Sequence, residues 1–94
     1  MRIEWSSEAY RDAISIINYI SEDDPVAALK LIERIEYNLQ ALKKFPEMGR
    51  IIPELNSKSI REIIVDDFYR VIYEVKSDVI LVATMRHTRR KPTP

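Results

Sequence analysis

Hydrophobic residues in the first part of the chain recur at two different spacings. Ile3 and Trp5 alternate with polar residues, and a period of two is typical of a strand with one buried face. The spacing then changes to three and four residues, which indicates one face of a helix, along Ala9, Ala13, Ile16, Ile17 and Ile20. We therefore predict a short strand, and then a helix that begins at a serine cap, Ser6 or Ser7, and ends near residue 23.

A second helix follows almost immediately. Asp24 is a good N-cap, and Pro25 suits the first helical position, where its missing N–H costs nothing. The apolar stripe continues along Ala28, Leu31, Ile32, Ile35, Leu39 and Leu42. Lys44 suits the negative end of the helix dipole, and Pro46 stops the helix. Since the link between the two helices is very short, we expect an antiparallel helical hairpin.

The second half of the chain is typical of a β-meander. A loop over residues 46–59 contains the single glycine, and strands are predicted over 60–65, 69–75 and 79–85, the last two joined by a tight turn at Ser77-Asp78. The fold class is α+β, in the order β-α-α-β-β-β, with the helical hairpin on one face of a small, largely antiparallel sheet. Strand alternation places Met85 with Ile72, Leu81 and Ala83 on the other face, which we expect to be open to a protein partner.

Composition narrows the class of protein. Ninety-four residues make a single domain, predicted over 1–90 with a short tail over 91–94. The absence of cysteine, of a long apolar run and of a signal-peptide pattern predicts a cytoplasmic protein without a membrane role. The net charge of zero argues against a general nucleic-acid binder, but residues 1–48 sum to −3 and residues 49–94 to +3. Any anionic partner is therefore expected to meet the second half.

Three polar residues of the second half have the chemistry of a metal-independent ribonuclease: Glu54, Arg70 and His87. A two-residue turn at Ser77-Asp78 would set Arg70 opposite Met85 and put His87 on the same face, whereas a three-residue turn would separate them. Arg70 would stabilise the charge of the transition state, His87 would move a proton, and Glu54 would supply a base for a ribose 2′-hydroxyl.

Structural roles for the same residues stay open. A single histidine at a strand end is often a packing or surface residue, and Arg70 could pair with Glu54 or Glu62, as Arg61 could with Asp66 or Asp67. One histidine without cysteine gives no zinc site, and one glycine gives no phosphate-binding loop, so we expect neither metal nor cofactor.

The order of short motifs over almost the full length resembles the RelE/ParE toxins of type II toxin–antitoxin systems. These motifs are Trp5 with the Ser-Glu-Ala helix start, Asp24-Pro25-Val26-Ala27-Ala28, Pro46-Glu47-Met48-Gly49-Arg50, Pro53-Glu54-Leu55, Ile60-Arg61-Glu62, Tyr69-Arg70-Val71-Ile72-Tyr73 and Arg86-His87-Thr88-Arg89-Arg90. The resemblance implies a growth-inhibiting toxin that forms a hetero-oligomer with a cognate antitoxin protein.

The resemblance leaves two targets. RelE-like members are ribosome-dependent mRNA endoribonucleases, and by similarity Arg70, Glu54 and His87 would be their catalytic residues; ParE-like members poison DNA gyrase by binding. This chain lacks the lysine cluster and the C-terminal tyrosine of many nucleases, and its helical hairpin is similar to the ParE side. The resemblance therefore favours gyrase, with the nuclease as the alternative and a detoxified module as a third class. Residues expected to bind the target or a phosphate are Arg50, Arg61, Arg86, Arg89 and Arg90.

Overall fold

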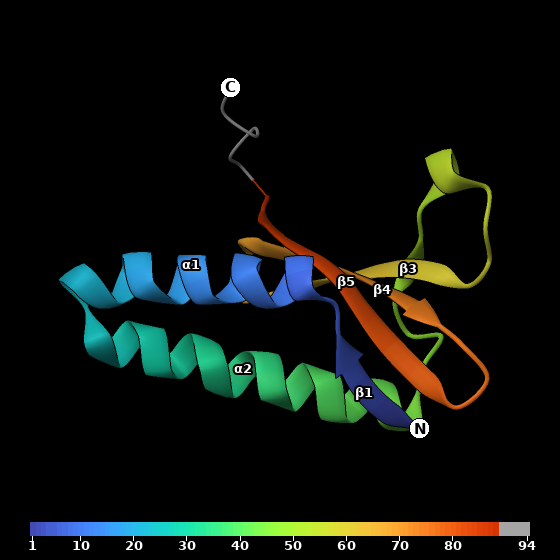
Figure 1. The fold of residues 1–94 in the computed structure, drawn as a ribbon, viewed down its shortest axis with the longest axis horizontal. Coiled ribbons are helices and arrows are strands. Elements are labelled where there is room, and N and C mark those ends of the chain that lie inside the picture. The colour runs from blue at the N-terminus through green and yellow to red at the C-terminus, as the bar shows by residue number, and fades with distance from the viewer. Residues whose placement is uncertain (89–94) are drawn as a thin grey trace.

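The computed structural model describes residues 1–88, in which two helices lie together on one side of a five-stranded sheet (Figure 1). The elements are β1 (Arg2–Trp5), α1 (Ser7–Asp23), α2 (Pro25–Lys44), β2 (Arg50–Ile51), the 3₁₀ turn η1 (Pro53–Leu55), β3 (Ile60–Val65), β4 (Tyr69–Val75) and β5 (Val79–His87). The strand order is β1-β5-β4-β3-β2, with β1 parallel to β5 and the other neighbours antiparallel. The predicted α+β fold is confirmed.

Both helix starts form as their sequences predict. The Ser6 hydroxyl accepts the N–H of Ala9 at 2.9 Å, and the Asp24 carboxylate accepts the N–H of Ala27 at 3.1 Å. These side chains satisfy donors that a helix leaves unpaired in its first turn. Within the described residues, neither α1 nor α2 is long and apolar enough to cross a membrane.

The core lies between the helices and one face of the sheet. It contains Ala9, Ala13, Leu31, Ile35, Leu39, Leu42, Ile63, Val65, Val71, Tyr73, Ile80, Val82 and Met85. The predicted stripes of both helices supply their half of it, except that Ile32 is exposed, so its predicted place in the stripe of α2 was wrong. Met85, however, belongs to the helix-covered face and not to the open face, so its predicted orientation was wrong. Its position follows from an irregularity in β5.

That irregularity is a bulge between β4 and β5. Near the Ser77-Asp78 turn the strands pair in the predicted register, with Tyr73 opposite Val82. Beyond that point β5 has one extra residue, Ala83, and the remaining pairs are Ile72 with Thr84, Val71 with Met85, Arg70 with Arg86 and Tyr69 with His87. A shift of one residue turns every following side chain to the other face of the sheet.

Helix α1 and its N-cap residue stabilise the bulge through one side chain each. The Ser6 hydroxyl donates to the carbonyl oxygen of Ala83 at 2.8 Å, and the Asp12 carboxylate accepts the N–H of Met85 at 3.1 Å. A bulge leaves backbone groups without ladder partners, and these two contacts satisfy them. The register of the second half of β5 is therefore fixed by residues some 70 positions earlier in the chain.

The segment predicted as a loop over 46–59 contains a fifth strand. Arg50 pairs with Glu62, and Ile51 pairs with Arg61, so that β2 forms one edge of the sheet. Two residues are too few to show a period of two in a sequence, and for this reason the strand was missed.

Candidate functional site

An ion triad spans three neighbouring strands on the open face of the sheet. Glu62 of β3 accepts from Arg50 of β2, with an Nε–Oε2 distance of 2.8 Å, and its other oxygen accepts from Nε of Arg70 of β4. The Glu62 side chain is only 7% exposed, whereas Arg50 is 62% and Arg70 40% exposed. Burial raises the pKa of Glu62, but the hydrogen bonds and charges of the two arginines outweigh it, so the pKa lies below its usual 4.5. Glu62 is thus ionised at neutral pH, and of the partners predicted for Arg70 it is the one observed.

Arg86 extends this arginine group across β5. It lies directly opposite Arg70 in the β4–β5 ladder, and its guanidinium reaches the Glu8 carboxylate of α1 at 3.4 Å. Like charges directly opposite in an antiparallel pair are unfavourable. By register Arg86 belongs to the open face with Arg50 and Arg70, which Glu62 holds, whereas the guanidinium of Arg86 is held by Glu8 of α1.

His87 lies on the helix-facing side of the sheet. Its ring stacks on Phe68, at 6.0 Å between centroids, and meets the edge of Tyr69 at 5.3 Å. It lines a cavity of about 220 Å³ beside α1, together with Ser15, Ile16, Tyr19, Ile20 and Tyr69. The predicted placement of His87 on the face of Arg70 was wrong, because the bulge at Ala83 reverses the alternation between them.

Glu54 lies apart from both Arg70 and His87. It is exposed within η1, which stands at the end of the molecule away from the α1–α2 connection (Figure 1). The three residues predicted to act together as a nuclease thus lie on a peripheral turn, on the open face of the sheet and on its helix-facing side.

Arg61 is mostly buried and has a structural role. Its side chain is 13% exposed, and one guanidinium nitrogen donates to the carbonyl oxygens of Glu47 at 3.1 Å and Gly49 at 2.9 Å. Asp66, a predicted partner, pairs instead with Arg34 at 3.3 Å. Arg61 therefore holds the loop after α2 against the sheet, and the prediction that it pairs with Asp66 or Asp67 was wrong.

Tyr73 and Gly49 also hold the loop after α2 against the sheet. The buried Tyr73 hydroxyl donates to the carbonyl oxygen of Pro46 at 2.7 Å and accepts the N–H of Gly49 at 3.0 Å. Burial raises the pKa of Tyr73 above its usual 10, so the hydroxyl stays protonated. A Cβ on Gly49 would lie 2.4 Å from this hydroxyl and 2.8 Å from the Glu62 carbonyl oxygen, so only glycine fits there.

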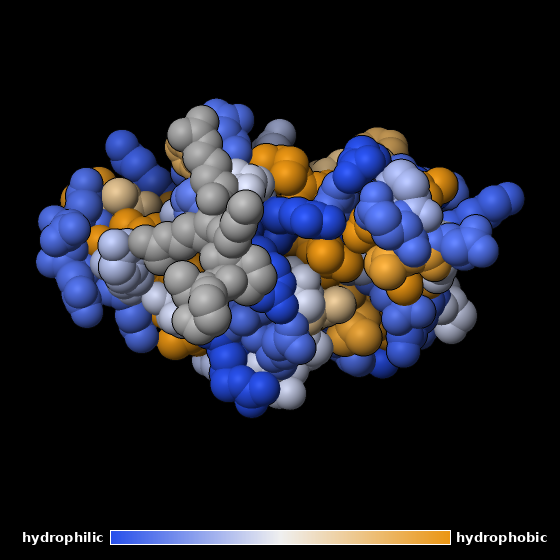
Figure 2. Space-filling view, turned by 90° about the horizontal axis from the view of Figure 1, so that it is seen from above, coloured by the Kyte–Doolittle hydropathy of each residue, from blue (hydrophilic) through white to orange (hydrophobic). Residues whose placement is uncertain are grey.

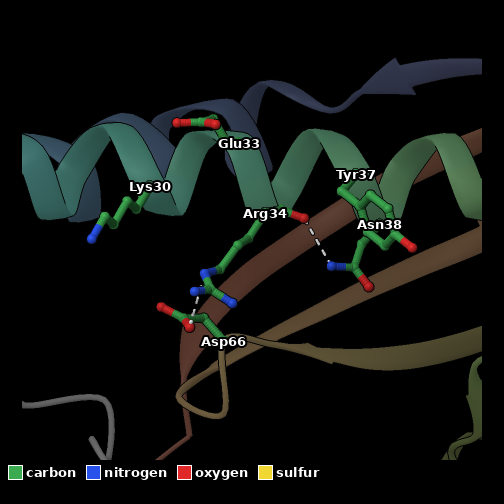
Figure 3. A pocket seen from close by; sticks show the side chains of 6 residues that line it. All are labelled: Lys30, Glu33, Arg34, Tyr37, Asn38 and Asp66. Atoms are coloured by element: carbon green, nitrogen blue, oxygen red, sulfur yellow. Dashed lines mark hydrogen bonds and ion pairs between the residues drawn. The ribbon is translucent and has the colours of Figure 1, made fainter.

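A broad polar groove lies between α2 and the β3–β4 turn, and Figure 3 shows it from close by. It measures about 600 Å³ and is lined by Lys30, Glu33, Arg34, Tyr37, Asn38 and Asp66. The Arg34–Asp66 ion pair links helix to turn across it, and Asn38 donates to the Arg34 carbonyl oxygen at 2.8 Å. Sequence reasoning missed this groove because its lining residues, apart from Asp66 of the turn, are helix positions outside the predicted apolar stripe.

The helical hairpin also carries an apolar groove on its own surface. It measures about 220 Å³ and is lined by Trp5, Tyr10, Ala13, Ile14, Ile17, Ile32, Ile35 and Glu36. Further large apolar side chains are exposed nearby along α2, among them Val26 and Leu29. The signal in the sequence is that Ile14, Val26 and Leu29 are hydrophobic although they lie off the core stripes.

Of the remaining predicted binding residues, Arg89 and Arg90 lie outside the described residues. Within residues 1–88 no group of three or more histidine or acidic side chains is arranged to hold a metal ion.

Comparison with known proteins agrees with this architecture. The family model described as the ParE toxin of the type II toxin–antitoxin system parDE matches residues 3–92. A candidate toxin, Y4kP of Sinorhizobium fredii, is 34% identical over 97% of this chain and 93% of its own length. Toxin RelE2 of Caulobacter vibrioides is 28% identical over 95% of this chain and 97% of its own.

A solved structure shares the fold. A chain of the chromosomal ParDE system from P. aeruginosa superposes with a TM-score of 0.73 over 93% of this chain and 95% of its own, at 19% identity. The family match over nearly the whole chain, with a relative above 30% identity, decides the assignment. The protein is therefore a member of the ParE toxin family of type II toxin–antitoxin systems.

Proposed function

We propose that this toxin inhibits growth by binding DNA gyrase, without catalysing a reaction. The observation that supports this is the separation of Arg70 and His87 on the two faces of the sheet. A general acid and the cation that stabilises the transition state must reach the same phosphodiester, and a sheet between them prevents this. The ParE family model points in the same direction.

The antitoxin partner that the family implies needs its own surface. The apolar groove along α1 and α2 suits an amphipathic helix of the antitoxin, because such helices place apolar residues at intervals of three and four into a groove of this kind. Binding there would cover Tyr10, Ile14 and Ile32, which are exposed in the isolated chain. The expected product is a hetero-oligomer in the cytoplasm, where gyrase is found.

A ribosome-dependent mRNA endoribonuclease is the second candidate. The adjacent Arg70 and Arg86 favour it, because two guanidinium groups side by side suit a phosphodiester. In that case Glu54 and His87 would also have to reach the substrate, which their present positions oppose.

Two assays on the purified toxin separate these functions. One measures supercoiling by DNA gyrase, and the other measures mRNA cleavage on programmed ribosomes, each with wild type and His87→Ala. The proposal predicts that both proteins inhibit supercoiling and that neither cleaves mRNA. Cleavage that His87→Ala abolishes, without inhibition of gyrase, would establish the nuclease instead.

A further inference from the structure

One end of the open sheet face combines cations with one exposed and one partly exposed isoleucine side chain. We call it the arginine face, made of Arg50, Glu62, Ile64, Arg70, Ile72 and Arg86. We propose that the arginine face docks an acidic, partly apolar segment of the protein that the toxin inhibits. This inference rests on the proposed function and specifies the surface that would carry it.

The charges of the arginine face call for an anionic partner. Arg70 and Arg86 are directly opposite, and three guanidinium groups share the two carboxylates of Glu62 and Glu8, so one positive charge is left over. Arg50 and Arg86 are each more than half exposed. A guanidinium has five donors, and a carboxylate can accept two of them side by side, so carboxylates from a partner would use donors that the ion pairs leave available.

Glu62 orients the cations for such a contact. It is almost buried and bonds Arg50 through one oxygen and Arg70 through the other. Two arginine side chains that are already held in place lose less conformational freedom when a partner binds them. The triad is therefore a preorganised part of the arginine face as well as a link between strands.

Isoleucine side chains between the arginines favour a protein segment over a nucleic acid. Ile64 is 50% exposed and pairs directly with Arg70, and the partly exposed Ile72 pairs with Glu62. Sites for single-stranded nucleic acid generally offer aromatic rings to the bases. In the described part of the sheet, Tyr69, Tyr73 and His87 face the helices instead. Figure 2 views the molecule from above relative to Figure 1, and on that side strongly hydrophilic and hydrophobic residues lie interspersed.

The test compares charge-neutralising variants of the full chain in the supercoiling assay. The double variant Arg70→Gln/Arg86→Gln removes two positive charges from the arginine face. The matched control Lys30→Gln/Arg34→Gln removes two from α2, which has no part in the proposed contact. Arg86→Glu is a second variant on β5 that leaves the Glu62 triad intact. Circular dichroism melting verifies that each variant is folded.

The concentration for half-inhibition is expected to rise by about tenfold or more for the double variant and for Arg86→Glu, since each loses charge-assisted contacts. For the control it is expected to stay unchanged. A folded double variant that inhibits like wild type would overturn the arginine face while leaving the gyrase function standing. Absence of inhibition by wild type would instead overturn the proposed function, and this inference with it. Tight binding of a labelled single-stranded RNA that the double variant loses would assign the face to nucleic acid and also overturn the proposal.

Discussion

Arg70 and His87 lie on opposite faces of the sheet, although both belong to the paired ends of β4 and β5. Arg70 is opposite Arg86 and points away from the helices, whereas His87 is opposite Tyr69 and lines a cavity beside α1. The extra residue Ala83 causes this separation. It divides the molecule into a sheet face that carries Arg70 and a helix-covered face that carries His87, and the proposed binding function rests on this separation.

His87→Ala is expected to keep toxicity while lowering stability. The substitution removes the ring contacts with Phe68 and Tyr69, and aromatic pairs of this kind contribute about 0.5–1.5 kcal/mol each beyond their buried area. Thermal unfolding of the purified variant measures the loss, and growth arrest on induced expression measures the toxicity. Full loss of growth arrest in a variant that is still folded would contradict this prediction.

Glu62→Gln is expected to destabilise the fold by about 1–3 kcal/mol at neutral pH, because two arginines lose their charged acceptor. Solvent around the exposed arginines should keep the value toward the lower end. Since the folded pKa of Glu62 is below 4.5, its contribution is fully present above that pH and is lost as the pH falls through the folded value. Urea unfolding between pH 3 and 7 measures the difference between the two proteins. A difference that stays constant down to the lowest pH would refute the assigned role.

Gly49→Ala and Tyr73→Phe are expected to be coupled. The alanine alone pushes a Cβ against the Tyr73 hydroxyl and should cost about 1–3 kcal/mol. Phenylalanine alone leaves the Gly49 N–H and the Pro46 carbonyl without this partner, at about 1–3 kcal/mol. Together they should cost less than the sum, because the removed hydroxyl is the nearest of the atoms that clash, although the contact with the Glu62 carbonyl oxygen remains. Chemical denaturation of all four proteins measures the coupling, and strict additivity would rule out this packing.

Asp12→Ala is expected to loosen the bulge. It leaves the N–H of Met85 without its acceptor, at a cost of about 1–3 kcal/mol. Hydrogen exchange at Met85 should become faster than at Ile80, which lies before the bulge in the regular ladder. Asp12→Asn, which keeps a carbonyl acceptor, serves as the milder control. Unchanged exchange at Met85 in the alanine variant would mean that α1 does not hold the bulge.

The features that the sequence predicted are local ones. Ser6 and Asp24 cap their helices through residues three positions later, and the apolar stripes of both helices follow from a period of 3.6. The tight turn at Ser77-Asp78 also depends on neighbouring residues, and the register close to it was right.

The features that were missed depend on contacts between distant residues. The bulge at Ala83 is held by Ser6 and Asp12, and no pattern within β5 reveals it. Strand β2 exists because Arg50 and Ile51 meet β3, and two residues carry no periodic signal. The candidate site was misjudged for the same reason, since one undetected residue in the register moved His87 to the other face.

Supercoiling by purified DNA gyrase, titrated with the wild-type toxin and with His87→Ala, tests the central claim most directly. We predict dose-dependent inhibition by both proteins, with half-inhibition concentrations that agree within about twofold, because the proposed arginine face lies on the opposite side of the sheet from His87. No inhibition by the wild type would contradict the claim that this protein acts by binding gyrase.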